Sequence, residues 1–199
     1  ADADDLVAEG CTVWEDVARA TLVVSKAGDL SQDVTPSNYL AVREALYKCS
    51  VPLGTGSIAQ DRTIIYDTDG KIIESRGEDP NVIGGFATAL CLTSDGASNS
   101  FNRGLALLNG KALGGDTQVL KAVMVHEFGH MIGLDHSQLN LNCLTASCAP
   151  GSDDFLGLPV MFPVLIDIAV SSASTLKTDD VAAVSALYPE SAFATSTGT

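Results

Sequence analysis

Residues 126–136 read H-E-F-G-H-M-I-G-L-D-H, and this stretch constrains the chain more than any other. On a helix, His126 and His130 lie about 6 Å apart along the axis, so both imidazoles leave the same face. Gly133 can adopt the left-handed conformation that ends a helix, and the chain can then bring His136 to the same point. The spacing predicts a metal site with three imidazole ligands.

The residue after the first histidine is a glutamate. On a helix, Glu127 lies about 100° further round, beside the predicted metal ion, where its carboxylate can act on water. Three neutral imidazoles leave a zinc ion its double charge and one open position, which is typical of catalytic zinc. We therefore predict one Zn²⁺ held by His126, His130 and His136, with Glu127 as the catalytic residue. The alternative is an amphipathic core helix with surface histidines, although these are the only histidines in the chain.

Length and composition predict a globular protein. A chain of 199 residues suits one domain over 1–199, and 46% hydrophobic with 18% charged residues argues against disorder. No apolar run approaches the ~20 residues that span a bilayer. The net charge of −14 argues against nucleic acid and anionic membranes as partners. We expect a monomer that is secreted or otherwise extracytoplasmic, its export signal removed, with flexible tails at 1–10 and 190–199.

The chain has five cysteines, an odd number: Cys11, Cys49, Cys91, Cys143 and Cys148. Cys143 and Cys148 bracket the short stretch L-T-A-S, and we predict a disulfide between them. One further bridge among the other three leaves one thiol free, and we favour Cys11 with Cys49. Buried free cysteines are the alternative.

Hydrophobic periodicity predicts strands and helices in mixed order. The predicted strands are Ala18–Ser25, Thr63–Tyr66, Gly85–Leu92 and Gly104–Leu108. The predicted helices are Ser37–Cys49, Thr117–Ile132 and Asp179–Tyr188, the second with Asp116 and the third with Thr178 as N-cap. We expect Val181, Val184, Leu187 and Tyr188 to form the buried stripe of the last helix. We predict an extended loop over Asn140–Leu158. We predict that the chain forms one α+β domain, divided by a cleft under the helix that carries the histidines.

Three segments resemble the matrixins, a family of the metzincin clan of zinc endopeptidases. The first is the histidine motif together with Ser137, which follows it. The second is P-V-M-F-P, in which Met161 resembles the methionine turn beneath the metal. The third is D-D-V-A-A-V-S-A-L-Y-P, which is similar to the C-terminal helix of the family. Their order and spacing also fit, so the resemblance covers most of Tyr66–Pro189.

The resemblance implies a metzincin-like single domain with a twisted, mostly parallel sheet, an antiparallel edge strand, a zinc-binding helix and a C-terminal helix. Gly85–Leu92 would be the edge strand that pairs with an extended protein or peptide substrate. The loop after Met161 would line the main specificity pocket. The implied activity is hydrolysis of peptide bonds by a zinc-activated water, assisted by Glu127. The second, structural zinc of animal matrixins is not expected, since no histidine is left to bind it.

Three acidic residues in D-T-D-G-K-I-I-E are candidate Ca²⁺ ligands: Asp67, Asp69 and Glu74. They resemble a fragment of a calcium loop but lack its full spacing, and a simple turn between two strands explains the same residues. Cys11 as a thiolate ligand of the zinc is an alternative to its disulfide.

Two other functions compete with the peptidase. One is a zinc-binding adhesion or interaction module that has lost turnover, and the other is a zinc hydrolase that acts on a different bond. The intact Glu127 disfavours the interaction module. The matches at Met161 and at the C-terminal helix disfavour a hydrolase that acts on a different bond.

Overall fold

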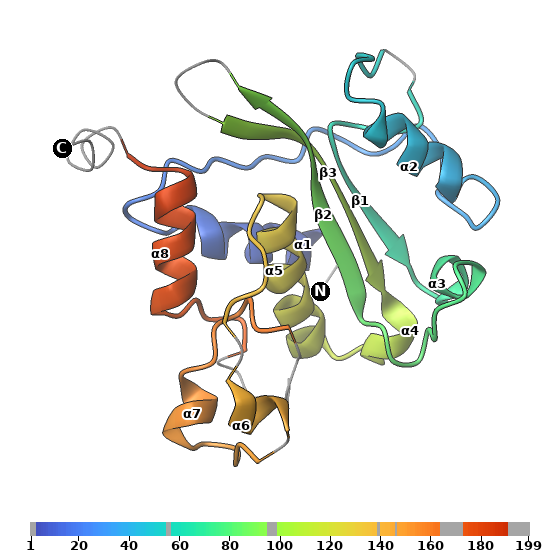
Figure 1. The fold of residues 1–199 in the computed structure, drawn as a ribbon. Coiled ribbons are helices and arrows are strands. Elements are labelled where there is room, and N and C mark those ends of the chain that lie inside the picture. The colour runs from blue at the N-terminus through green and yellow to red at the C-terminus, as the bar shows by residue number, and fades with distance from the viewer. Residues whose placement is uncertain are drawn as a thin grey trace. The chain divides into compact units, whose positions relative to one another are not determined.

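The computed structural model describes residues 3–54, 57–94, 99–138, 140–145, 147–163 and 173–190 (Figure 1). The chain groups into two compact units. The first consists of residues 1–26, 117–129 and 134–199, and the second of residues 27–116 and 130–133. The described elements form a mixed α+β structure, and the single domain stays a prediction.

The second unit contains a three-stranded sheet. Its strands are β1 (Arg62–Asp67), β2 (Gly85–Ser94) and β3 (Asn99–Asn109), in the order β1-β3-β2 (Figure 1). The three strands predicted at 63–66, 85–92 and 104–108 are therefore confirmed, and β3 begins five residues earlier than expected.

The register of the sheet makes it mixed. β1 runs parallel to β3, with Ile65 opposite Leu107, whereas β2 runs antiparallel to β3, with Thr88 opposite Leu105. The predicted antiparallel edge strand is confirmed in β2. The expectation of a mostly parallel sheet is wrong for the described residues, because only one of the two pairings is parallel. The parallel pairing is possible because the connection from β1 to β3 is long enough to contain a helix and β2.

Helices cover this sheet within the second unit. Helix α2 (Tyr39–Tyr47) confirms the helix predicted at 37–49, while the short helices α3 (Lys71–Ser75) and α4 (Gly110–Leu113) were not predicted. The core of the unit consists of buried side chains from α2, α3, the strands and the segment before β1: Tyr39, Val42, Leu46, Ala59, Ile65, Ile72, Ile73, Leu90, Cys91, Leu105 and Leu107.

One disulfide joins α2 to the sheet. Cys49 lies just after α2 and is bonded to Cys91 on β2, with their Cα atoms 5.2 Å apart. The predicted bridge between Cys11 and Cys49 is therefore wrong, and Cys11 is a buried free thiol. Sequence separation could not reveal this pairing, because it depends on how α2 packs against the sheet.

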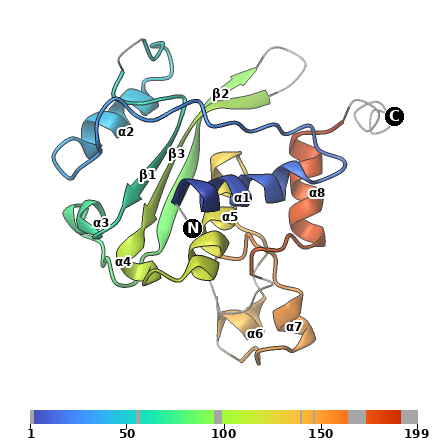
Figure 2. The same cartoon turned by 180° about the vertical axis from the view of Figure 1, so that it is seen from behind.

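In the first unit, helix α1 (Ala3–Glu15) packs against helix α5 (Thr117–Met131) (Figure 2). The prediction of a tail at 1–10 is wrong for residues 3–10, which form most of α1. Leu6, Gly10 and Trp14 recur every four residues and are buried, so this acidic segment has an apolar stripe. Of the second predicted tail, 191–199 lies outside the described residues.

The predicted strand Ala18–Ser25 is absent. The segment makes one isolated bridge, between Ala20 and Pro189, and the backbone N–H of Thr21 donates to the carbonyl of Tyr188. Its β-branched residues favour extended backbone, but a strand also needs a partner of similar length. Within the described chain that partner is limited to residues 188–190, and Val23 is 86% exposed.

The region predicted as an extended loop, 140–158, contains two short helices. Asn140 and Ser152 accept hydrogen bonds as side-chain N-caps of α6 (Leu141–Leu144) and α7 (Asp153–Leu156). The predicted Cys143–Cys148 disulfide is confirmed. Its two cysteines pack with phenylalanines in a small cluster: Cys143, Cys148, Phe155 and Phe162.

Helix α8 (Thr178–Leu187) confirms the predicted C-terminal helix, with two corrections. The N-cap is Lys177 rather than Thr178, which is the first helical residue. The buried side of α8 consists of Asp180, Val184 and Ser185, whereas Val181 is exposed. The predicted stripe was wrong because it counted only apolar residues, whereas two of the three buried residues, Asp180 and Ser185, are polar.

No helix in the described ranges is long and apolar enough to cross a membrane.

The buried thiol leads to a first prediction. Burial, together with nearby Glu15, raises the pKa of Cys11 to about 12, so the thiol stays protonated at pH 8. Because the thiolate is the reactive form, the native protein should not react with Ellman's reagent. Unfolding without a reductant should expose one thiol per chain. Three reactive thiols after unfolding would show that one of the two disulfides is absent. Fast reaction of the native protein would contradict the burial of Cys11.

Candidate metal centre

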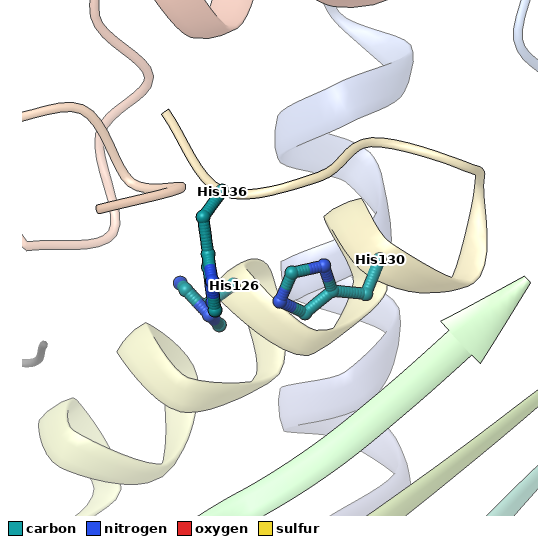
Figure 3. Close-up of side chains that lie close together, drawn as sticks. All are labelled: His126, His130 and His136. Atoms are coloured by element: carbon teal, nitrogen blue, oxygen red, sulfur yellow. The ribbon is translucent and has the colours of Figure 1, made fainter. Parts of the chain in front are cut away.

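The three histidines come together as the motif predicts. His126 and His130 lie on α5, and His136 lies five residues beyond its end. Each offers one ring nitrogen, and these nitrogens all lie within 4.8 Å of one another. Figure 3 shows the three rings directed toward a common point. Three imidazole nitrogens at this spacing fit a divalent transition metal ion, and the donor set suits zinc, copper, iron or nickel.

The loop between the second and third histidines turns where Gly133 was expected to turn it. Gly133 has a φ of 102°, which side-chain-bearing residues rarely adopt. The N–H of Gly133 donates to the carbonyl of His130, and the N–H of Leu134 donates to the carbonyl of Gly129. These bonds close the end of α5 and direct the chain back so that His136 faces His126, with 5.4 Å between the ring centroids.

The tautomer of His126 follows from its partner. The Nδ1 atom of His126 lies 2.7 Å from the backbone carbonyl oxygen of Val160. A carbonyl can only accept, so Nδ1 carries the proton and donates it. In the neutral ring, Nε2 then keeps its lone pair for a metal ion. A hydrogen bond of this kind orients a ligand and raises its basicity.

The three histidine side chains differ in their burial, which decreases from His126 to His136. His126 is buried, His130 is partly buried and His136 is exposed. An ion held by these side chains would therefore be open to solvent on the side of His136. A catalytic metal needs such an open position, whereas a structural zinc is enclosed by four protein ligands.

Glu127 is buried on α5, directly after His126. It belongs to a run from 122 to 129 in which every residue is buried. His126 and Glu127 are the only polar side chains in that run, and burying polar groups opposes folding unless they are compensated. This local concentration of costly groups is typical of a functional site.

Met161 packs against α5 between the two helical histidines. Met161 is buried, and a Cβ atom placed on Gly129 would overlap its sulfur. The N–H of Ser137, next to His136, donates to the carbonyl of Met161 over 2.8 Å. Met161 is thus joined to the neighbours of His130 and His136. Its role as a methionine turn stays a prediction.

Asp180 is the residue at this site that the sequence analysis missed. Its buried carboxylate accepts hydrogen bonds from the backbone N–H groups of Val160, Met161 and Lys177, at 2.9, 3.1 and 2.8 Å. It therefore fixes the segment whose carbonyl orients His126. A hint was present in the sequence, since the first turn of the C-terminal helix holds two aspartates where one would serve its dipole.

The calcium candidates are not among the groups of potential metal ligands in the described residues. Asp67 is buried and accepts from the N–H groups of Ile72 and Ile73 at the start of α3. Asp69 pairs with Lys71, whose hydrogen bonds lower the pKa of the Asp69 carboxyl. Among the described residues, the only group of three or more potential ligands is the three histidines. Asp67 ends β1 and Glu74 lies on α3, so the connection is a turn into a helix rather than a turn between two strands. Calcium binding by Asp67, Asp69 and Glu74 stays a prediction.

Cys11 does not belong to the group of potential ligands either. Its raised pKa disfavours the thiolate that a metal would need. The alternative of Cys11 as a zinc ligand therefore has no support in this structure.

Comparison with models of known protein families finds no match, and no curated protein matches the chain. The resemblance to the matrixins therefore rests on the three sequence segments alone.

The contact between Gly129 and Met161 generates the second prediction. In Gly129→Ala, the added methyl group would overlap the Met161 sulfur and press on Trp14, 3.0 Å away. We expect a loss of about 1–3 kcal/mol in the free energy of unfolding and weaker metal binding. Urea denaturation and chelator competition measure these two quantities. Gly54→Ala is the matched control, because its Cβ meets nothing within 4 Å. Equal behaviour of the two variants would contradict the close packing.

The third prediction concerns the two neighbouring aspartates of α8. Asp180→Asn replaces one oxygen with an NH₂ group that cannot accept from the N–H groups around it. We expect unfolding to become easier by about 2 kcal/mol, and metal binding to weaken because the Val160 carbonyl is no longer held. Asp179→Asn, at the exposed neighbour, should change both quantities little. A parental metal affinity in Asp180→Asn would show that the carboxylate does not support the site.

Proposed function

We propose that the protein is a zinc-dependent endopeptidase of the matrixin type. The observation that carries the proposal is the convergence of His126, His130 and His136, with Glu127 next to the first of them. The resemblance of the three sequence segments supports the same activity. The partly exposed ligand set favours a catalytic ion over a structural one.

The three histidines would hold the ion through ring nitrogens. When bound, zinc acts as a Lewis acid on a peptide carbonyl and brings the pKa of water toward about 7. The Nδ1–H of His126 stays on the Val160 carbonyl and keeps the ring in its orientation. The exposed His136 leaves that side accessible to a substrate.

Glu127 would perform the proton transfers. Its carboxylate takes a proton from the water that attacks the carbonyl carbon and passes it to the nitrogen of the departing amine. The buried position of Glu127 supports this role, since a carboxylate with little water around it interacts more strongly with nearby charge.

The substrate would be a protein or peptide in extended conformation. In the described part of the chain, β2 has a partner strand on one side only, so its other edge can pair with a peptide backbone. We propose β2 as the substrate-binding strand. The predicted specificity loop after Met161 lies largely outside the described residues, since 164–172 are among those not described.

We also propose that the protein works outside the cytoplasm. Its disulfides Cys49–Cys91 and Cys143–Cys148 support this, because such bonds persist in oxidising compartments.

Substitution of Glu127 tests the function. Glu127→Gln should retain zinc and the fold, because the residue is not a predicted ligand. It should lose at least about 100-fold in the rate of casein digestion, because the amide cannot take the proton. Zinc content, circular dichroism and peptide release measure the three properties. Glu44→Gln, at an exposed glutamate of α2, is the control and should match the parent.

Removal of the metal completes this test. A strong chelator should abolish casein digestion by the parent, and added Zn²⁺ should restore it. Digestion by Glu127→Gln at the parental rate would refute the mechanism. A zinc-loaded parent that cleaves neither casein nor a peptide library would indicate the interaction module instead.

A further inference from the structure

The chain has a single tryptophan, and it contacts the helix that carries two of the metal ligands. Trp14 lies on α1 and is completely buried. Its indole N–H donates to the backbone carbonyl of Val125 over 2.9 Å. Val125 directly precedes His126. A carbonyl in the middle of a helix does not need this bond for its own helix, so the contact ties α1 to one position of α5.

The indole ring reaches a second position on α5, one turn later. A Cβ atom on Gly129 would lie 3.0 Å from the Cζ2 atom of Trp14. Gly129 directly precedes His130. Trp14 therefore contacts the residue before each of the two helical histidines, through a hydrogen bond at one and through ring packing at the other.

Other contacts hold α1 in place beside α5. Gly10 approaches so closely that a Cβ there would lie 2.9 Å from the Cγ atom of Met124. The carboxylate of Glu9 pairs with Lys121 at 2.9 Å. Both contacts are made to the part of α5 just before Val125, at Lys121 and Met124. The position of Trp14 along α5 is thus determined by several independent contacts.

We propose that Trp14 is a positioning residue for the metal centre: it holds the turn of α5 between His126 and His130 in the geometry that a metal ion needs. The inference rests on the metal binding that the proposed function requires. Metal ligands act only when they are held close to their bound geometry, and groups behind the ligands provide that restraint. Helix α1 is then a part of the metal centre's support, contributed from the amino-terminal end of the chain.

The test measures metal affinity in a variant that keeps an aromatic ring. Trp14→Phe removes the indole N–H and the part of the ring nearest Gly129. We expect zinc affinity, measured by chelator competition, to fall by at least about 10-fold, which is typical of losing an outer support of a ligand. The ligand-field absorption of the Co²⁺-loaded variant should also differ from that of the parent, because the ligands relax to another geometry.

The control is a matched substitution in the second unit. Tyr39 is buried, and its hydroxyl accepts a hydrogen bond from Arg76 over 2.8 Å. Tyr39→Phe thus removes one hydrogen bond of a buried aromatic residue, as Trp14→Phe does. It should leave zinc affinity and the Co²⁺ spectrum unchanged. Circular dichroism and urea denaturation establish that both variants are folded.

The outcomes separate the inference from the proposed function. Parental zinc affinity and spectrum in Trp14→Phe would overturn the inference, and so would an equal loss in Tyr39→Phe. Where Trp14→Phe does not fold, replacement of Trp14 by benzothienylalanine decides the matter, because it keeps the bicyclic shape and removes only the N–H. Weaker zinc binding then supports the inference, and parental binding overturns the part of it that the hydrogen bond to Val125 carries. A parent that binds zinc but digests no protein would refute the peptidase alone.

Discussion

The segment beside the candidate metal centre is held by the carboxylate of Asp180. A buried carboxylate is costly, and here three backbone N–H groups compensate it. Two of them belong to Val160 and Met161, so α8 fixes the segment that passes next to α5. The Val160 carbonyl then determines which nitrogen of His126 is protonated. The orientation of a ligand thus depends on a residue 54 positions later in the sequence, through two successive hydrogen-bonded steps.

A second contribution to holding the Met161 segment against α5 comes from packing around Gly129. The absence of a side chain at this position lets the Met161 sulfur and the Trp14 ring both approach α5 between two ligands. Any larger residue would separate these elements. The hydrogen bonds to Asp180 and the packing at Gly129 meet at Met161. Its N–H donates to the Asp180 carboxylate, and its carbonyl accepts from the N–H of Ser137. One buried methionine therefore connects α8, α5 and the residue after the third ligand.

The sequence was most informative where the controlling interactions are local. The spacing of the histidines, the turn at Gly133 and the five-residue separation of Cys143 and Cys148 depend on nearby backbone geometry, and each was predicted correctly. The Cys49–Cys91 pairing depends on tertiary packing, and the sequence could not supply it. The same limit applies to Asp179 and Asp180, which are chemically identical neighbours. Only the packing of α8 decides which of them is buried.

Composition misled the interpretation of the amino-terminal region. The acidic residues of 1–10 suggested a tail and the β-branched residues of 18–25 suggested a strand, but neither property reports on a partner. Residues 3–15 have an apolar stripe that packs on α5, whereas 18–25 has no long strand beside it within the described chain.

Helix α5 places His126 and Glu127 inside a run of eight consecutive buried residues, 122–129. Apolar side chains in these two positions would fill such a helix at a lower desolvation cost. The surrounding structure instead supplies a carbonyl to His126, a buried carboxylate to hold that carbonyl, and a tryptophan beside the same turn. Each of these groups restrains a polar residue that the fold alone does not require. A catalytic metal centre, as proposed above, would account for such an arrangement, because functional sites commonly carry polar groups that cost stability.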